Sequence, residues 1–193
     1  MNQPELIEQL QQGDESAFKK LVDDWQDMVY NTALGIVKHA DDADDITQEV
    51  FIQAYKSISS FKGDSKLSTW LYRITLSKAL DHEKKKKRKK RFGFMQSLFG
   101  GDVEEQVLAA EFDHPGVQLE KKEKARELFN ALNQIPGKQR IAFTLHKLEG
   151  QSYQEIAEIM NTTLYAVESL MGRAKASLKK ELKNYYDNNI AEK

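Results

Sequence analysis

The stretch from Ser152 to Leu182, SYQEIAEIMNTTLYAVESLMGRAKASLKKEL, constrains the fold more than any other part of the chain. Ser152 and Glu155 have the spacing of a capping box, in which each side chain satisfies a backbone N–H at the start of a helix. Asn161 follows, and Asn tolerates the left-handed backbone of a tight turn better than any residue except Gly. The pattern predicts a short helix, a sharp turn and a longer second helix.

Thr163 stands where its hydroxyl can cap this second helix, whose apolar positions recur three and four residues apart. The positions expected to face inward are Leu164, Val167, Leu170, Met171, Ala174 and Leu178. The small side chain of Ala157 allows the two helices to cross closely. This arrangement indicates a helix-turn-helix, whose second helix enters the major groove of DNA. An ordinary helical hairpin within a bundle has the same pattern and is the alternative.

The composition favours a mostly helical protein of one or two domains, because 193 residues include 31% charged residues and only 10 Gly and 3 Pro. The lack of cysteine excludes disulfides, thiol catalysis and cysteine-based zinc sites. No apolar run approaches the length of a membrane span, and the N-terminus does not resemble a signal peptide. We therefore expect a cytoplasmic protein with no membrane insertion of its own.

The net charge of −1 conceals a strong segregation of charge along the chain. Residues 84–91 are KKKKRKKR, a run without any acid, whereas residues 92–118 hold acids but no Lys or Arg. Such segregation indicates that one part of the chain binds a polyanion. Residues 92–118 also lack a clear period and contain two adjacent glycines and a proline, which predicts a flexible linker.

The N-terminal half carries two further amphipathic helices. Asp14 can cap the first, whose apolar stripe is expected to be core and consists of Phe18, Leu21, Val22, Trp25, Met28, Val29, Ala33, Ile36 and Val37. The second covers residues 41–58, with an expected buried face of Ile46, Val50, Phe51, Ala54, Tyr55 and Ile58. On another face of that helix lie Asp45, Gln48 and Glu49. This acidic patch is either a solvated surface or a site for a protein partner.

No catalytic or cofactor-binding constellation is evident. The four histidines, at positions 39, 82, 114 and 146, are too dispersed for a metal motif. The acids near residue 42 lack the glycine and the terminal Glu of a calcium-binding EF-hand loop. There is no phosphate-binding glycine loop and no nucleophile elbow. We therefore expect neither enzymatic activity nor a cofactor.

In order and separation, four segments of the chain resemble a group IV, extracytoplasmic-function RNA polymerase sigma factor of bacteria. These segments are DADDITQEVFIQAY (42–55), FKGDSKLSTWLYRI (61–74), Asp81 with the basic run after it, and SYQEIAEIMNTTLYAVESLMGRAK (152–175). The resemblance implies an all-α protein of two small helical domains. A sigma-2-like domain would cover residues 1–91 and a sigma-4-like helix-turn-helix domain residues 119–187, with 92–118 as the linker.

The resemblance also implies a function. Such a protein binds core RNA polymerase, directs it to promoters by recognising their −10 and −35 elements, and helps to melt the DNA. Its expected partners are the β′ and β subunits and promoter DNA, with an anti-sigma factor as a further candidate. The alternative is a stand-alone helix-turn-helix regulator with an N-terminal sensor domain, which would bind its operator unaided.

The matching positions assign roles to individual residues. Those expected to bind core polymerase, on a coiled coil of β′, are Asp45, Gln48 and Glu49. Those expected at the −10 element and in melting are Ser65, Lys66, Thr69, Trp70, Arg73, Ser77, Lys78, Asp81 and His82. Those expected at the −35 element are Thr163, Tyr165, Glu168, Ser169 and Arg173. The cations expected along DNA phosphates are Lys84, Lys85, Lys86, Lys87 and Arg88.

The recognition helix departs from the family pattern in one place. The family often has Gly-Thr-Val-Lys-Ser-Arg where this chain has YAVESL at 165–170, so Glu168 and Leu170 replace two cations. Glu168 either accepts from the amino group of a cytosine or faces solvent. Phosphate contacts near the −35 element are then expected from Arg173, Lys175 and Lys138.

Overall fold

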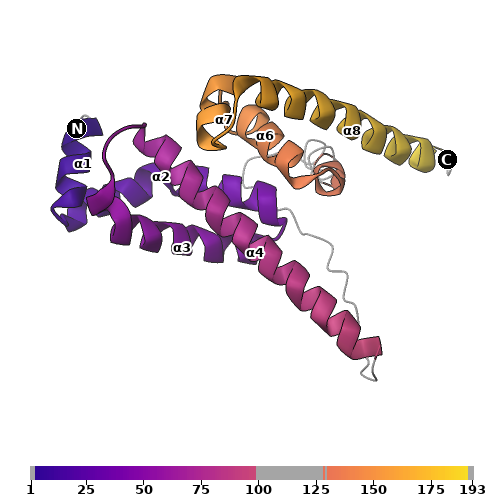
Figure 1. Cartoon of the computed structure of the whole chain (residues 1–193), viewed down its shortest axis with the longest axis horizontal. Helices are drawn as coiled ribbons and strands as arrows, with labels where there is room; N and C mark the ends of the chain where they lie inside the picture. Colours follow the sequence, from indigo (N-terminus) through magenta and orange to yellow (C-terminus); the bar gives the residue numbers. More distant parts are fainter. Residues whose placement is uncertain (1–2, 99–127, 129, 191–193) are drawn as a thin grey trace. The chain divides into compact units, whose positions relative to one another are not determined.

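The structure is a computed structural model that describes residues 3–98, 128 and 130–190, with side chains described except at 90–98 and 184–190. Every regular element in these residues is a helix, which confirms the all-α prediction (Figure 1). The chain forms two compact units. We call Met1–Lys62 with Ile74–Glu111 the N-terminal unit, and Gly63–Arg73 with Phe112–Lys193 the C-terminal unit.

The helices of the first part of the chain are α1 (Gln3–Gln11), α2 (Glu15–Val37), α3 (Ala40–Ser57), the short 3₁₀ helix η1 (Ile58–Ser60) and α4 (Leu67–Leu98). Between α1 and α2, Gly13 adopts a φ of 79°. Asp14 then caps α2 by accepting a 2.9 Å hydrogen bond from the Ala17 N–H. A cap of this kind stabilises a helix by about 1 kcal/mol.

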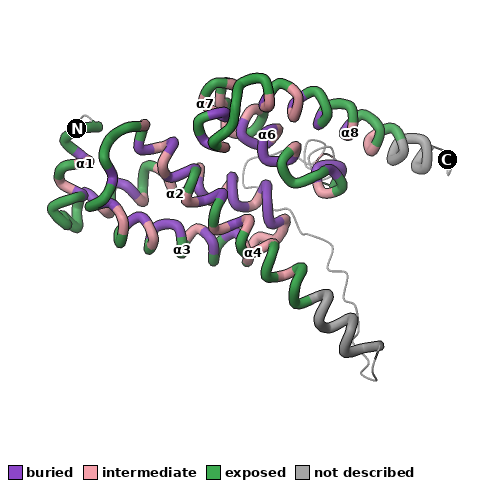
Figure 2. Tube along the Cα trace, in the orientation of Figure 1, coloured by how far each residue is buried: buried purple, intermediate pink, exposed green. Residues whose placement is uncertain are grey.

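Helices α2 and α3 pack against each other as a hairpin with a very short joint. Lys38 closes α2 in a left-handed conformation with a φ of 75°, and its N–H donates to the Leu34 carbonyl at 3.0 Å. His39 is extended and precedes α3. Small or β-branched residues, including Ala33, Ala43 and Val50, are fully buried in this unit, and the buried faces of α2 and α3 can be followed in Figure 2.

The predicted apolar stripe of α2 is confirmed as core. Its fully buried members are Leu21, Val29, Ala33, Ile36 and Val37, and its half-buried members are Phe18, Val22, Trp25 and Met28. The prediction for α3 is wrong at Tyr55, which is 57% exposed. Tyr55 contacts Phe18 in a T-shaped arrangement, with ring centroids 5.1 Å apart.

Helix α4 has 32 residues and ends at Leu98. It therefore includes residues 92–98, the first part of the segment predicted as a linker; residues 99–118 lie outside the described residues. The first turns of α4, up to Arg73, group with the C-terminal unit, whereas the sequence-based division placed them in the N-terminal domain. The domain limits at residues 91 and 118 stay predictions.

The C-terminal unit contains helical residues 130–134, then α6 (Gly137–Lys147), α7 (Tyr153–Ile159) and α8 (Leu164–Ile190). Helices α6, α7 and α8 pack pairwise against one another. One cluster of the core consists of Ala131, Leu132, Ile135, Ala174 and Leu178, flanked by Leu128, Phe143 and Leu182. A second set of buried side chains, from α6, α7 and α8, includes Leu145, Ile156, Val167 and Met171. The described helices of this unit therefore share a buried core, as expected for a small helical domain.

Candidate nucleic-acid and partner interfaces

The start of the helix-turn-helix is built as the sequence predicts. The Ser152 Oγ accepts from the Glu155 N–H at 3.2 Å, and the Glu155 carboxylate accepts from the Ser152 N–H at 3.0 Å. Helix α7 ends at a turn in which Asn161 has a φ of 49° and the Thr162 N–H donates to the Ala157 carbonyl at 2.9 Å. These local bonds fix the direction in which the chain enters the next helix.

The second helix, α8, is capped by Thr163, whose Oγ1 accepts from the Ala166 N–H at 3.2 Å. Val167 and Met171 are buried, as expected, and so is Ala157 on α7. Leu164 was predicted to face inward, but it is 43% exposed because it is the first residue of α8 and lies beyond the reach of α7. The contact between the two helices is therefore made at Val167 and Met171, as predicted, with Leu170 half-buried beside them.

The outward face of the first turns of α8 carries the residues predicted to contact the −35 element. Tyr165 is 80% exposed, and Thr163, Glu168 and Arg173 are exposed as well, whereas Ser169 is half-buried. Because residues three and four apart share a helix face, Tyr165, Glu168 and Ser169 form one continuous strip. One side of a DNA groove could contact all three residues at once.

The acidic patch on α3 is exposed at all three predicted positions, Asp45, Gln48 and Glu49. The exposed Glu49 carboxylate lies 3.3 Å from the Nζ of half-buried Lys78 on α4, and an ion pair with an exposed partner contributes little to stability. Beside the patch lie two large apolar side chains that sequence reasoning missed. Ile52 is 54% exposed and Tyr55 is 57% exposed. Apolar side chains next to polar ones are typical of protein interfaces.

The spacing of residues along α3 could have identified Ile52 and Tyr55 as exposed. Ile52 falls outside the stripe of buried positions on α3. It follows Gln48 by four residues and precedes Tyr55 by three, and residues at such intervals lie on one side of a helix. The three therefore share one face of α3, and Tyr55 stands at the edge of that face where it contacts Phe18 of α2. We name Asp45, Gln48, Glu49, Ile52 and Tyr55 the α3 surface.

Helices α3 and α4 border a charged cavity of about 340 Å³ in the N-terminal unit. Its lining is Ile46, Glu49, Lys78, Asp81, His82, Lys85 and Arg88. The structure thus brings together three residues predicted at the −10 element and two predicted to bind phosphate. A cavity with this volume and with several cations can take a nucleotide-sized group.

Two lysines of the basic run have carboxylate partners within the unit. Lys86 donates to Asp42 at 2.7 Å, and Lys84 to Asp81 at 3.0 Å. The His82 Nε2 lies 3.3 Å from the other oxygen of Asp42. Burial raises the pKa of Asp42, but the hydrogen bond and charge of Lys86, with help from His82, outweigh burial and hold that pKa below its usual value. Asp42 therefore stays ionised and anchors this part of α4.

The residues predicted to contact the −10 element differ in their exposure. Lys66 and Arg73 are exposed, and Ser65 and Trp70 are half-buried. Thr69 is only 3% exposed. Ser77 is exposed, further along α4.

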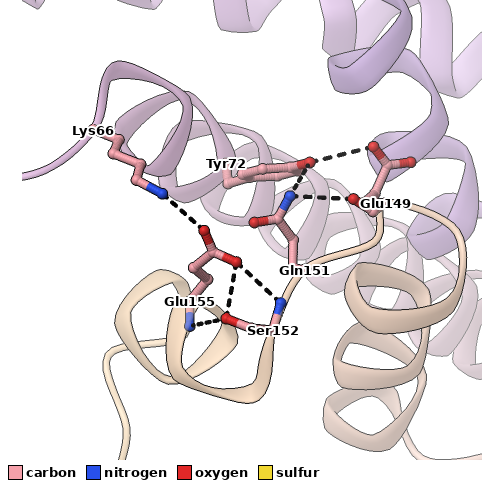
Figure 3. A network of polar contacts seen from close by, with 6 residues as sticks. All are labelled: Lys66, Tyr72, Glu149, Gln151, Ser152 and Glu155. Atoms are coloured by element: carbon pink, nitrogen blue, oxygen red, sulfur yellow. Dashed lines mark hydrogen bonds and ion pairs between the residues drawn. The ribbon is translucent and has the colours of Figure 1, made fainter.

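Lys66 and Arg73 are both engaged within the C-terminal unit. The Lys66 Nζ lies 2.9 Å from the Glu155 Oε1, and this ion pair is one of the dashed contacts in Figure 3. The Arg73 guanidinium donates to the Glu158 carbonyl from Nε at 3.2 Å and from Nη2 at 2.8 Å. The hydrogen bond from Lys66, together with those from Ser152, lowers the pKa of Glu155 to about 2.

In the part of the chain that the structure describes, no group of three or more His, Cys, Asp or Glu residues has the arrangement of a metal site. None of the helices described there combines the length and the apolarity that a membrane span requires.

Comparison with known proteins agrees with this geometry. Residues 21–89 match the family model for sigma-70 region 2, and residues 125–178 match that for sigma-70 region 4. The chain is 33% identical over 180 residues to the ECF RNA polymerase sigma-E factor of Haemophilus influenzae, covering 92% of this chain and 93% of that protein. It is 31% identical over 178 residues to the RNA polymerase sigma-H factor of Pseudomonas aeruginosa, covering 92% of each.

Solved structures show the same fold. CnrH in complex with the cytosolic domain of CnrY superposes with a TM-score of 0.68 at 23% identity, covering 94% of this chain and 97% of that one. The sigma factor RpoE in complex with the anti-sigma factor NepR, from Bartonella quintana, gives a TM-score of 0.64 at 25% identity, covering 86% and 96%.

The chain belongs to the extracytoplasmic-function subfamily of sigma-70 RNA polymerase sigma factors. It is a transcription initiation factor that directs RNA polymerase to promoters, and the alternative of a stand-alone regulator is not favoured. Members of this family are DNA-binding factors without enzymatic activity of their own.

Proposed function

We propose that promoter recognition is divided among three surfaces of this chain. The α3 surface binds core polymerase in the cytoplasm, the loop and helix from Ser65 to His82 bind the melted −10 element, and the first turns of α8 read the −35 element. The observation that carries the proposal is the helix-turn-helix, because its capped turn leaves Tyr165 and Glu168 facing outward from a locked helix pair.

The α3 surface has the composition that a polymerase contact requires. Its carboxylates and amide can pair with cations and backbone N–H groups, and Ile52 and Tyr55 supply apolar area next to them. Aromatic side chains surrounded by polar ones are the usual energetic centre of an interface. We propose that Tyr55 is such a centre and that Asp45 and Glu49 orient the partner.

The cavity between α3 and α4 and the basic run form the second surface. Lys78, Lys85 and Arg88 on the cavity wall, with exposed Lys87 beside it, can follow the backbone of a single strand. His82 adds a donor or acceptor on the cavity wall, and Ser77 offers an exposed hydroxyl elsewhere on α4. Charge without fixed geometry positions DNA, whereas base contacts specify its sequence.

An anti-sigma factor is a further proposed partner. The RpoE structure that resembles this chain was solved in complex with the anti-sigma factor NepR. We also propose that the linker, residues 92–118, reaches toward the polymerase active-site channel, as the family resemblance implies.

Run-off transcription with core polymerase tests the proposal. We expect promoter-specific transcripts only when this chain and core polymerase are both present, and no tight binding of a promoter by the chain alone. A stand-alone regulator would instead bind its operator with a Kd of about 10⁻⁸ M or tighter in the absence of polymerase. That result, without any transcript, would overturn the proposed function.

A further inference from the structure

The last turns of α4 combine a dense run of cations with an apolar stretch that phosphate binding does not explain. Residues 84–91 are KKKKRKKR, and residues 92–98, FGFMQSL, follow directly within the same helix. We call residues 84–98 the α4 tip. Figure 1 shows the end of α4 leading away from α2 and α3. No acid occurs in the sequence between Glu83 and Asp102, so the α4 tip has positive charge and apolar residues but no negative charge of its own.

The cations of the α4 tip are open to solvent over most of the part whose side chains are described. Of residues 84–89, Lys86 is half-buried and the other five are exposed. Lys84 and Lys86 have carboxylate partners in Asp81 and Asp42. A run with this density of charge attracts any surface that carries many negative charges, whatever connects them.

The helical period gathers the apolar residues of the α4 tip on one side of the helix. These four residues are Phe92, Phe94, Met95 and Leu98. Because each residue turns an α-helix by about 100°, all four positions fall within one half of the circumference. The positions in the other half are Gly93, Gln96 and Ser97. A helix with aromatic and aliphatic residues on one side and with many cations has the composition of helices that lie in a membrane interface.

Two kinds of polyanion suit the cations, and the apolar residues favour one of them. A nucleic acid offers bases on which aromatic rings can stack, but Met95 and Leu98 have no ring for this purpose. A bilayer has an acyl boundary below its charged headgroups, and this boundary accepts aromatic and aliphatic residues alike. None of the helices that the structure describes is long and apolar enough to cross a membrane, so the contact is with the bilayer surface.

We propose that the α4 tip binds the surface of anionic phospholipid bilayers, with the basic run at the headgroups and the apolar half of residues 92–98 in the interface. This inference goes beyond the proposed function, in which the basic run binds DNA phosphates. It gives residues 92–98 a ligand that promoter DNA does not provide. The headgroups and the DNA phosphates would bind to the same ammonium and guanidinium donors.

Flotation of the full chain with lipid vesicles tests the charge requirement. The chain should float with phosphatidylcholine vesicles that contain one third phosphatidylglycerol, and not with vesicles of phosphatidylcholine alone. Changing Lys85, Lys87 and Lys89 together to Gln should weaken binding roughly a hundredfold, which is about fivefold for each cation near an anionic surface. The matched control has the same change at three exposed lysines of α8, Lys179, Lys180 and Lys183. The control should bind as the native chain does.

Two double variants separate a bilayer from a nucleic acid. Phe92→Leu with Phe94→Leu removes the rings but keeps apolar residues, whereas Phe92→Ser with Phe94→Ser removes both. The serine variant should lose roughly tenfold or more in vesicle affinity, and the leucine variant only a small part of that. Neither should change the affinity for a single-stranded oligonucleotide, because its phosphates bind the cations, which both variants keep.

The depth of individual positions in the bilayer gives a readout that a folding defect does not imitate. Because the chain contains no cysteine, Met95→Cys and Ser97→Cys each give a single labelling site, one in each half of the circumference. With vesicles bound, lipids that carry a nitroxide in the acyl chain should quench a fluorophore at position 95 strongly and one at position 97 weakly.

Four results would each overturn the inference. They are equal binding to neutral and anionic vesicles, an equal loss in the two triple-lysine variants, equal quenching at positions 95 and 97, and a leucine variant as weak on vesicles as the serine variant. If both double variants were also weak on the oligonucleotide, the rings would be assigned to base stacking instead. Failure of run-off transcription would count against the proposed function alone, because the vesicle measurements involve no polymerase.

Discussion

At the residue scale, a few exposed side chains determine which DNA base the chain can recognise. Glu168 is the clearest case, because it is an exposed acid on a helix face expected to approach a polyanion. Such a group repels phosphate unless a base-edge donor compensates, and the cytosine amino group is the donor that suits a carboxylate.

We therefore expect Glu168→Gln to relax the −35 preference at one base pair by about 1–3 kcal/mol, while the preference elsewhere is kept. Selection of −35 sequences with the native and variant proteins, each bound to core polymerase, measures this change. A uniform gain in affinity on every −35 sequence would show that Glu168 only faces solvent.

Glu149 gives a second prediction at this scale. Burial raises its pKa from 4.5 to about 7, and the Tyr72 hydrogen bond offsets only part of the rise. Because the folded pKa lies above the unfolded one, the folded chain binds the extra proton between these values, and stability falls as the pH rises from about 4.5 to about 7. The loss should be about 1–3 kcal/mol in the unfolding of the C-terminal unit.

Denaturant unfolding of the full chain at a series of pH values measures this effect. Glu149→Gln keeps an acceptor for the Tyr72 hydroxyl and should flatten the pH dependence in that window. An equally steep dependence in the variant would assign the effect to another group.

At the scale of elements, local rules predicted the helix-turn-helix well. The caps at Ser152 and Thr163 and the turn at Asn161 depend on neighbours within a few residues, so their sequence carries the information. The errors at Tyr55 and Leu164 lie at the edges of apolar stripes, where periodicity alone cannot separate a buried side chain from a half-covered one. The hydrogen bond of Tyr72 with Glu149 joins residues 77 positions apart, and no local pattern encodes it.

The packing of α7 on α8 leads to a prediction of stability. Val167 is fully buried between these helices, so Val167→Asp would place an unpaired charge in the core, at a cost of several kcal/mol. The C-terminal unit should lose its cooperative transition while the N-terminal unit keeps its own. Site-specific hydrogen exchange can follow the two units separately, and Val167→Ala should produce only a smaller loss. One shared transition would mean that the units do not unfold independently.

The α3 surface leads to a prediction of binding. Asp45→Ala combined with Glu49→Ala should weaken core polymerase binding by about 2–4 kcal/mol, because truncation of central interface residues has costs of this size. Helix content should hardly change, since both side chains are exposed. The matched control is Glu8→Ala with Asp23→Ala, which removes two exposed acids from α1 and α2. If the two double variants bound core polymerase with equal affinity, Asp45 and Glu49 would be solvated residues without a part in binding.

At the scale of the whole molecule, the segregation of charge is the feature that matters most. The net charge is only −1, yet the α3 surface exposes Asp45 and Glu49, whereas the basic run of α4 exposes Lys85, Lys87 and Arg88. The two meet at the cavity between α3 and α4, where Lys78 pairs with Glu49 and Lys86 with Asp42. Away from this border each surface has a predominant sign, which favours one kind of partner over the other.

The basic run should affect all promoters alike. Lys85, Lys87 and Arg88 are exposed, whereas Lys84 and Lys86 are paired with Asp81 and Asp42. Changing the first three to Gln should lower open-complex formation on every promoter and reduce the log–log salt slope by roughly 0.7–0.9 for each phosphate that the variant no longer neutralises. Lys84→Gln with Lys86→Gln should have a smaller effect per residue. A defect confined to one promoter class would show that the run reads sequence.

The joint of Lys38 and His39 between α2 and α3 has a consequence for the way the chain acquires its structure. Two residues close the hairpin, so the contacts between these helices are near in sequence and the entropy lost on closing the loop is small. Chains rich in local contacts fold fast. Because synthesis proceeds from the N-terminus, both helices of the hairpin leave the ribosome before the C-terminal unit does. The surface proposed to meet polymerase can therefore form early, whereas α8, which carries the residues proposed to read the −35 element, forms late.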